Sequence, residues 1–532
     1  MHEQSLTKGL KSEFSCKFHS TNEKKYIRMK RIIILIAATV LMLPVRVSGQ
    51  NMDDAVRYSK IFYQGSARFN AMGGAFTALG GDISAIALNP AAAGVFRSTE
   101  ISITPVVFFR DLNTDYNGFN SNDSYSGLTL GQIGLVSSFG TGNGSGLSNL
   151  SFAYSFNRTN NYYRHSVIDG INENGSMADF WALQADGYRT GELDGAAWMA
   201  YEAYLIDTLP NYLDQYASIF SGYGEAVPAY GQKVKRTIDN AGYSNEHNIT
   251  LGANINDKLY LGAGFGITNI SYSGHYVHTE VDEAQNVFDF VNFVYTDDFN
   301  AIGAGWNFKI GAIARPIESL RIGFSFTTPT IYTVEEVFYN SLTALLDYDT
   351  PSDQSDDLKP EITQDDMRYR YRITTPYHIN AGIAYQVGNI AMISADYEFI
   401  DYASARLSRG EDGYEFNYEN EDISSELGST GNLRLGAEVR LGSLYLRGGY
   451  SYYGSAFNSG TLNEDSDSNG YSAGIGYRQN KFYVDMAMVW LNSYESYMMY
   501  PDDPRSAPLY SSDPAYLSSK DNYLSLTVGL KF

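Results

Sequence analysis

Three arginines separated by single residues are the side chains in this sequence best suited to bind an anion. Arg368, Arg370 and Arg372 stand in the stretch MRYRYRITTPYHIN at 367–380, which alternates like a β-strand. Alternation places them on one face with His378, and a guanidinium can bind a carboxylate through two parallel hydrogen bonds. If the opposite face meets lipid, the arginines line a watery interior, where they either capture a substrate carboxylate or neutralise acids of the next strand. Those acids are Asp396 and Glu398.

An apolar helix is predicted inside the long polar segment 165–243. The stretch DGAAWMAYEAYLIDTL has aromatic and aliphatic residues at helical spacing after a candidate N-cap at Asp194. This helix either packs on its own loop or forms an apolar cap or ligand groove, and the two interpretations are compatible. In the second, it would hold the apolar tail of a ligand whose carboxylate the arginines bind. The candidate residues are Trp198, Tyr201 and Leu205.

Other chemistries have weak support. The single cysteine, Cys16, precedes the expected mature chain, so thiol catalysis and cysteine-bound metals are not expected. The stretch DSDSNG at 465–470 resembles the start of a calcium loop, but Gly476 occupies the twelfth position. No Ser/His/Asp group stands out, so we expect no catalytic site, no enzymatic activity, no cofactor and no metal. The one further group that could hold a metal or haem is His275, His278 and Glu280.

The N-terminus has the pattern of a secretory signal peptide at residues 29–49. Lys30 and Arg31 precede an apolar run that ends before the small residues Val47-Ser48-Gly49. We interpret residues 1–28 as a mis-assigned leader and Gln50 as the mature N-terminus. The alternative is a signal anchor, but the run is shorter than the ~20 residues that span a bilayer.

The composition is strongly acidic. The net charge of the full chain is −22. Residues 1–49 carry nine basic and three acidic side chains, so the exported chain has a net charge near −28. Such a surface repels nucleic acid and anionic lipid, so we expect neither as a binding partner.

Alternation of apolar and polar residues recurs along most of the chain. In YLSLTVGLKF at 523–532, leucines, Val528 and Phe532 share one face, while Ser, Thr, Gly and Lys share the other. The sequence has 44 tyrosines, which suit aromatic girdles at the two membrane interfaces. The fold class is therefore all-β, a transmembrane antiparallel β-barrel of about 14 strands at 97–532, rather than a soluble sandwich. A chain that ends on Phe532 resembles the signal read by the barrel-assembly machinery.

Short and long connections alternate along the predicted barrel. Very short turns are expected near 256–257, 316–318, 387–388, 442–443 and 479–480, and long polar loops near 275–298, 336–366, 407–429, 455–468 and 492–519. Short turns face the periplasm and long loops face outside in such barrels. The segment 165–243 is then a partly helical extracellular insert. We expect a monomer.

A stretch rich in Gly and Ala precedes the first strand. SARFNAMGGAFTALGGDISAIALNPAAAG at 66–94 resembles the N-terminal hatch of the FadL-type family, which transports long-chain fatty acids and other hydrophobic compounds, including aromatic hydrocarbons. The resemblance implies that residues 50–96 plug the barrel lumen and that substrate leaves sideways through a wall opening. Two departures are the long loop after the third strand and the aliphatic residues 86–88. The residues carrying the hatch motif are Ser66, Arg68, Gly73, Gly74, Asp82, Asn89, Pro90 and Ala91.

The resemblance implies a transporter in the outer membrane of a Gram-negative bacterium, surrounded by outer-membrane lipid. Its partner would be a hydrophobic small molecule such as a long-chain fatty acid, admitted by hatch-gated lateral diffusion. The alternative is a barrel subunit of a protein-secretion or surface-attachment machine. A lipid-modifying enzyme is a third, less favoured hypothesis.

Overall fold

The computed structural model describes residues 52–532 except 142–145, 222–228, 288, 348–357 and 501–512. The predicted leader 1–28, the signal peptide 29–49 and the cleavage at Gln50 lie outside these residues. Residues 51–532 form one compact unit. Within the described residues, no helix is both long and apolar enough to cross a membrane.

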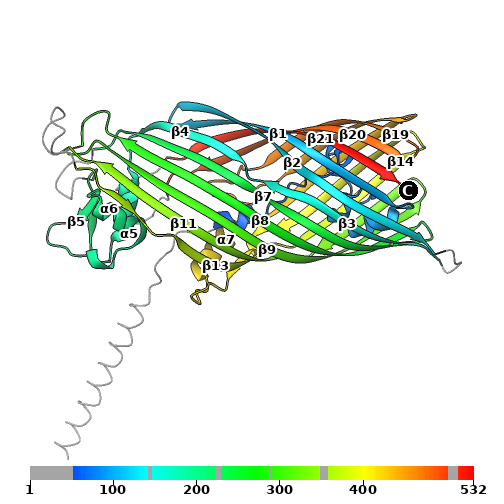
Figure 1. Ribbon diagram of the computed structural model, residues 1–532, viewed down its shortest axis with the longest axis horizontal. Helices are drawn as coiled ribbons and strands as arrows, with labels where there is room; N and C mark the ends of the chain where they lie inside the picture. Colours follow the sequence, from blue (N-terminus) through cyan, green and yellow to red (C-terminus); the bar gives the residue numbers. More distant parts are fainter. Residues whose placement is uncertain (1–51, 142–145, 222–228, 288, 348–357, 501–512) are drawn as a thin grey trace, which may run out of the picture. The chain divides into compact units, whose positions relative to one another are not determined.

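A closed antiparallel barrel of fourteen strand passages forms the wall, which confirms the predicted fold (Figure 1). It closes where β1 pairs with β21, with Ile101 opposite Leu530. Four passages are interrupted and carry two labels each: β3–β4, β10–β11, β13–β14 and β15–β16. The wall strands are β1 (Glu100–Tyr116), β2 (Phe119–Gly140), β3 (Leu147–Asn161), β4 (Arg164–Asn172), β7 (Gln232–Ile255), β8 (Leu259–Val281), β9 (Asn292–Ile317), β10 (Leu320–Thr327), β11 (Ile331–Leu345), β13 (Met367–Thr374), β14 (His378–Val387), β15 (Ala391–Asp401), β16 (Arg406–Ser408), β17 (Ser429–Leu441), β18 (Leu444–Tyr453), β19 (Ser468–Gln479), β20 (Phe482–Tyr497) and β21 (Ala515–Lys531).

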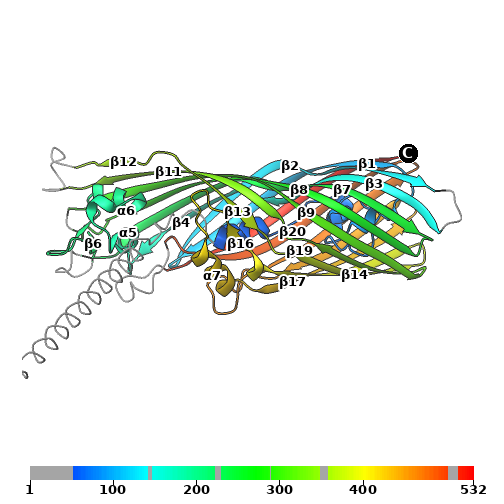
Figure 2. The same ribbon diagram turned by 90° about the horizontal axis from the view of Figure 1, so that it is seen from below.

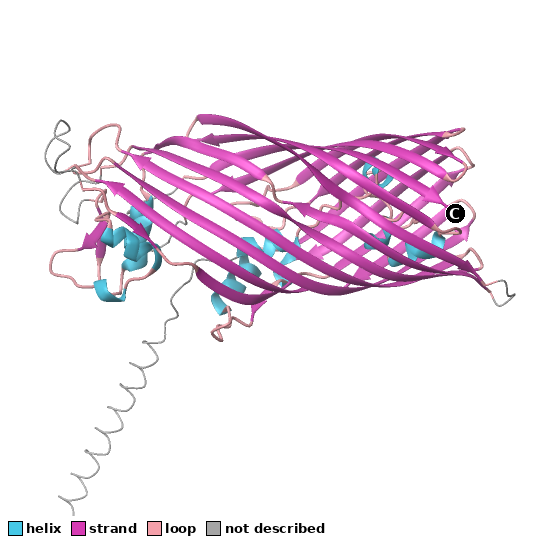
Figure 3. Cartoon of the chain, in the orientation of Figure 1, coloured by secondary structure: helices cyan, strands magenta, loops and turns pink. Residues whose placement is uncertain are grey.

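Helices and short strands lie inside the barrel, at one of its ends or, for one helix, at its side (Figure 3). In the N-terminal segment these are α2 (Met52–Ser59), α3 (Ala67–Ala71), α4 (Ala85–Leu88) and the 3₁₀ helix η1 (Pro90–Val95). The insert after β4 contains α5 (Met177–Ala185), η2 (Thr190–Glu192), α6 (Gly195–Glu202), β5 (Ile206–Thr208) and β6 (Tyr216–Ser218). The remaining elements are β12 (Glu361–Thr363), η4 (Tyr402–Ser404) and α7 (Asn417–Glu426).

The predicted short turns connect the strands at one end of the barrel. Asn256 and Asp257 both have positive φ, 54° and 57°, as a tight type I′ hairpin requires. The C-terminus lies at this end (Figure 1), where the Phe532 amide donates to the Thr99 carbonyl. Short turns identify this end as periplasmic. Recognition of Phe532 by the assembly machinery stays a prediction.

Partway along the long strands, the inward side chains change from polar to apolar and the outward side chains change from apolar to polar. On β9, Phe308 points outward with 52 % of its surface exposed, while the neighbouring Lys309 is buried inside. Nearer the extracellular end of the same strand, Phe299 is buried inside and Asn300 points outward. The lower half therefore has lipid outside and a polar interior, whereas the upper half stands in water around an apolar interior.

This reversal corrects part of the loop prediction. The segments 275–298 and 336–366 were expected to be loops, but β8 runs to Val281, β9 starts at Asn292 and β11 runs to Leu345. Their outward residues are polar because these parts of the strands rise above the membrane. The insert is likewise shorter than 165–243, since β4 and β7 take up both of its ends.

Candidate transport pathway

Residues 60–96, here called the hatch, cross the lumen at the height of the lipid belt. Arg68 is buried, and its Nε donates to Glu438 on β17 at 2.9 Å. Arg447 on β18 donates to the same carboxylate at 2.5 Å and to Asp485 on β20 at 2.6 Å. Because each charge has a partner, this buried network can join the hatch to three wall strands without isolating an ion.

The other predicted hatch residues hold the segment in its folded shape. The Ser66 hydroxyl caps α3 by accepting from the Phe69 amide, and it donates to Asp82 at 2.8 Å. Asn89 accepts from the Ala91 amide at 3.0 Å and donates to the Thr77 carbonyl at 2.7 Å. Pro90 opens η1, where its missing N–H leaves no donor unsatisfied. Their gating role stays a prediction.

Close backbone contact brings the hatch against the wall at β17 and β18. Gly73 and Gly74 have positive φ, 61° and 76°. A Cβ at Gly73 would lie 2.7 Å from the Tyr450 carbonyl oxygen. Any other residue there would be strained and would clash with the wall, which explains the glycine pair.

The wall itself has a break between β2 and β3. Their ladder runs from Gly140 only as far as Gln132, which pairs with Asn157. Between Gln132 and the start of β2 at Phe119, the described residues of β2 pair with β1 alone. The register between β1 and β2 shifts around Gly131. Leu128, beside this break, is 74 % exposed. The break therefore opens toward the outer, apolar face of the barrel.

The hatch fills this break by pairing with the free edge of β3. The Gln64 amide donates to the Arg158 carbonyl at 2.9 Å, and the Phe62 amide donates to the Thr159 carbonyl at 2.7 Å. Side chains complete the closure: Arg158 donates to Thr129 at 2.7 Å. The rings of Tyr125 and Tyr163 also stack across the gap at 5.6 Å. The segment 62–64 thus substitutes for the missing strand contact.

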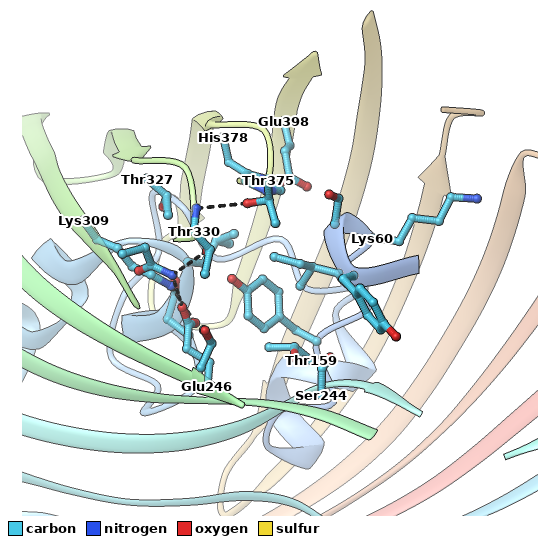
Figure 4. Close-up of a pocket in the computed structure, with 18 of the residues that line it drawn as sticks. Lys60, Thr159, Ser244, Glu246, Lys309, Thr327, Thr330, Thr375, His378 and Glu398 are labelled. Carbon is cyan, nitrogen blue, oxygen red and sulfur yellow. Dashed lines mark hydrogen bonds and ion pairs between the residues drawn. The ribbon is translucent and has the colours of Figure 1, made fainter. Parts of the chain in front are cut away.

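A small polar cavity lies above the hatch (Figure 4). On one side Lys309 donates to Glu246 and to the Ala87 carbonyl, both at 2.6 Å. On the other side His378 lies 3.0 Å from Glu398, while Lys60 extends away from both (Figure 4). The free volume of about 20 Å³ is room for about one water molecule. The lumen is therefore closed here.

Above this cavity, an apolar cluster seals the middle of the lumen. Helix α2 contributes Val56 and Tyr58, which pack with Tyr371 on β13 and Phe416 beside α7. Figure 2 shows α7 beside β13 and β16 at the side of the barrel. The N-terminal segment therefore blocks the lumen at two heights, with the hatch below and α2 above.

The insert residues 173–221, here called the cap, close the extracellular mouth. Trp181 on α5 is buried against Phe293 and Tyr295 of β9. The cap also packs on inward residues of β1, β4, β7, β11 and β21. Its predicted residues lie in this cluster: Leu205 is fully buried, and Trp198 and Tyr201 pack against it half-buried. The helix is shorter than predicted, and the Asp194 side chain makes no cap hydrogen bond.

One buried carboxylate fastens the cap to the wall. Glu280 on β8 accepts from the Ser176 hydroxyl at 2.6 Å and from the Met177 amide at 2.8 Å, at the N-terminus of α5. His278 donates to it at 3.0 Å. Burial lowers the pKa of His278 and raises the pKa of Asp179, in the first turn of α5, to about 7. His275 faces outward instead and bonds Asp298, so the three candidate metal ligands do not converge.

The arginines do not line the lumen, which overturns their predicted orientation. Tyr371 and Ile373 are buried inside, whereas Arg368 and Arg370 are exposed on the outer face and Arg372 is half-buried there. Two physical causes explain the error. Residues 367–374 lie above the lipid belt, where the apolar face turns inward. In addition, the Thr375-Pro376 interruption shifts the alternation, so that His378 faces inward.

The expected pairing with interior acids is also wrong. Arg370 pairs instead with Glu335 on the neighbouring β11, at 2.5 Å on the outer surface. Glu398 binds His378 and Arg434, and Asp396 accepts from the Thr77 amide of the hatch at 2.7 Å. Sequence reasoning missed the residues that fill the break, because Phe62 and Gln64 carry no motif.

Two solved structures share this architecture. A FadL homologue from Pseudomonas aeruginosa aligns over 89 % of this chain and 100 % of its own, with 14 % identity and a TM-score of 0.56. The Pseudomonas putida toluene transporter TodX aligns over 88 % of this chain and 99 % of its own, with 13 % identity and a TM-score of 0.50. No protein-family model and no curated protein sequence matches the chain.

At this identity the similarity concerns the fold. The FadL-type fold predicted from the hatch motif is confirmed, with a closed barrel, an internal N-terminal hatch and an outward apolar belt. Bacterial barrels with such a belt lie in the outer membrane of Gram-negative cells, and so does this chain.

Proposed function

We propose that this chain, which has the FadL-type barrel fold, transports hydrophobic small molecules across the outer membrane and releases them sideways through the break between β2 and β3. The observation that carries the proposal is the pairing of hatch residues 62–64 with the free edge of β3. Because only two backbone hydrogen bonds join this segment to β3, it can leave the break without separating any pair of wall strands. TodX is a toluene transporter, which is consistent with this role and with a non-enzymatic function.

Long-chain fatty acids are the proposed substrate class. The cavity above the hatch has polar walls that include Lys309, Asn307 and His378. Burying such groups against a pure hydrocarbon would cost their hydrogen bonds. This lining favours a substrate with a polar end over one without it. A bound fluorescent fatty acid should be displaced more effectively by an unlabelled fatty acid than by a hydrocarbon of equal length. Equal displacement by the two compounds would contradict this preference.

A disulfide across the break tests the route. Gln64 and Arg158 are directly paired, so their Cα atoms lie within reach of a disulfide bond. The Gln64→Cys/Arg158→Cys variant, reconstituted in liposomes, should lose uptake of a labelled fatty acid when oxidised and regain it on reduction. The matched control Tyr494→Cys/Ser518→Cys joins two paired wall residues of β20 and β21 and should transport in both states.

Two outcomes would contradict the proposal. Equal uptake by the oxidised and reduced Gln64→Cys/Arg158→Cys protein would exclude the break as the route. Absence of uptake by the unmodified barrel in the same liposomes would favour the alternative role in a secretion or attachment machine.

A further inference from the structure

The outer wall above the lipid belt carries a strip of arginines on β13 and β16. Arg368, Arg370 and Arg372 point outward on β13. Arg406 points outward on β16, where it pairs with Thr374, and Arg372 pairs with Ser408. Arg372 and Arg406 are therefore diagonal neighbours on the same face, about 7–8 Å apart and somewhat closer between their Cβ atoms. This strip is the surface that the sequence had placed inside.

Aromatic side chains fix the height of the strip. Tyr377 lies on the outer face directly below it, and its ring packs on Phe326 and Phe399 at 6.1 and 6.5 Å. Such outward aromatic rings mark the membrane interface in transmembrane barrels. On this passage the strip thus begins directly above an outward aromatic ring.

Strand pairing connects the strip to the interface by a second path. Trp306, which is 44 % exposed, pairs with Ile331, which pairs with Thr374, which pairs with Arg406. One row across four strands therefore runs from an interfacial tryptophan to Arg406. Because barrel strands are tilted by about 35–45°, this row is inclined to the membrane plane, and the nearer marker of height is Tyr377, directly below Arg372 on the same passage. We place the arginines in the head-group region just above that ring.

Most of the positive charge in this strip is not neutralised within the described residues. Arg370 has Glu335 as its partner. Arg406 donates to two carbonyls of its own loop, Ala403 and Ala405, and has no ion pair in the described chain. Arg372 has none there either, and its Nε is buried without a hydrogen-bond partner. A buried donor that forms no hydrogen bond costs free energy, so an anion that reaches it would be bound.

We propose that Arg372 and Arg406, with Arg368 beside them, bind the phosphate groups of outer-leaflet lipids. A guanidinium matches a phosphate through paired hydrogen bonds, and two of them at this spacing can share one phosphate. The net charge near −28 disfavours anionic surfaces in general, but in this strip four arginines stand against two carboxylates, Glu335 and Glu411. The bound lipid would fix the rotation of the barrel and the height at which β13 leaves the membrane.

The probe for this site is lipid A that carries both phosphates, titrated into the detergent-solubilised protein with bound lipid counted by native mass spectrometry. The Arg372→Gln/Arg406→Gln variant should bind it about tenfold more weakly, because two charge-assisted hydrogen-bonding groups are lost. The control variant Arg315→Gln/Arg440→Gln removes two arginines of the periplasmic end that donate to carbonyls of their own turns. It should bind lipid A as the unmodified protein does.

Three results would overturn the proposal. The first is unchanged lipid A binding by the Arg372→Gln/Arg406→Gln protein, provided that heat-modifiable gel mobility shows a folded barrel. The second is an equal affinity for lipid A stripped of its phosphates, which would mean that acyl chains alone are bound. The third is full competition by millimolar inorganic phosphate, which would identify a free-anion site. Retained fatty-acid uptake by the same variant would separate this site from the transport route.

Discussion

The hatch and the cap close the two ends of one barrel, but they contact its wall in opposite ways. The hatch is joined by buried charge and backbone groups, such as Arg68 with Glu438 and the Thr77 amide with Asp396. The cap is joined by an apolar cluster around Trp181, with Glu280 as a buried polar anchor. One closure is polar inside a lipid belt, and the other is apolar inside a wall that stands in water.

This difference predicts how each closure behaves when it opens. Water can replace the hydrogen bonds of a displaced hatch, so its net cost of release is moderate. A displaced cap would expose its apolar cluster, and water offers no replacement for that burial. We therefore expect the hatch to be displaced more readily than the cap.

Deleting each closure should give the largest contrast. Removal of residues 50–90 should leave the barrel closed through the pairing of β1 with β21 but with the break between β2 and β3 unfilled, and it should give a stable open channel once the cap is also replaced by a short linker. Replacement of the cap residues 173–221 alone by a short linker should leave conductance at the leak level, since the hatch and α2 still block the lumen. Planar-bilayer recording measures both. An open channel in the cap deletion alone would reverse the assignment.

After the deletions, the second largest effect is expected when the positive charge that joins the hatch to the wall is removed. The Arg68→Met variant leaves Glu438 with Arg447 as its remaining cation, and breaking such a buried pair costs about 3–5 kcal/mol. In a barrel whose cap is replaced by a short linker, we expect frequent channel openings that increase with urea. The double variant Arg68→Met/Glu438→Gln should open less often than Arg68→Met, because no uncompensated carboxylate remains. Equal opening in the two variants would show that packing, rather than charge, holds the hatch.

A truncation of similar energy in the cap should have no effect on conductance. Trp181→Ala removes the largest fully buried side chain among the described residues, at a cost of about 3–5 kcal/mol. Amide hydrogen exchange in α5 should accelerate strongly while the bilayer current stays at the leak level. A rise in current with this variant would make the cap a second gate.

The effect of pH on the stability of the cap should be smaller than the effects of these variants, and it has two opposing parts. Burial raises the pKa of Asp179 to about 7, so its stabilising contribution is complete below about pH 4 and is lost as the pH rises toward 7. Burial lowers the pKa of His278, so its contribution is complete above about pH 6.5 and is lost as the pH falls through the lowered value. The two slopes oppose each other below pH 6.5.

Single variants should separate these slopes. Asp179→Asn should leave a cap that loses stability on acidification below pH 6.5. His278→Gln should leave one that gains stability as the pH falls from 7. Each slope should be at most about 1.4 kcal/mol per pH unit, and the unmodified cap should be flatter than either. Hydrogen exchange of α5 between pH 5 and 7, corrected for intrinsic rates, measures this. Parallel slopes in the two variants would contradict the assignment.

The smallest effect on stability and uptake is expected from the substitution of Arg370. Its pair with Glu335 is exposed on the outer wall, and exposed pairs contribute little to stability. Arg370→Gln should change neither the apparent Tm nor fatty-acid uptake. Loss of uptake in a folded Arg370→Gln protein would restore the carboxylate-capture hypothesis that its orientation disfavours.

Much of the fold followed from patterns with a direct physical cause. Strands such as 523–532 alternate because lipid and water lie on opposite sides of the wall, and the turn at Asn256-Asp257 has the residues that a tight hairpin needs. The hatch was found from its Gly73-Gly74 and Asn89-Pro90-Ala91 motifs. The orientation of Arg368–Arg372 was missed because alternation shows which residues share a face but not which face is wet. The break was missed because it depends on a register shift at Gly131, which no local pattern shows.

The interruption at Thr375-Pro376 has a consequence for how such a chain can vary. Below it, the inward residues of β14 are even-numbered, as His378 is; above it, those of β13 are odd-numbered, as Tyr371 is. An insertion of one residue elsewhere in a strand would turn every following side chain to the wrong side. At this joint the two halves already keep separate phases, so an added or lost residue can be absorbed there. The extracellular half could therefore diversify in length while the half in the lipid stays unchanged.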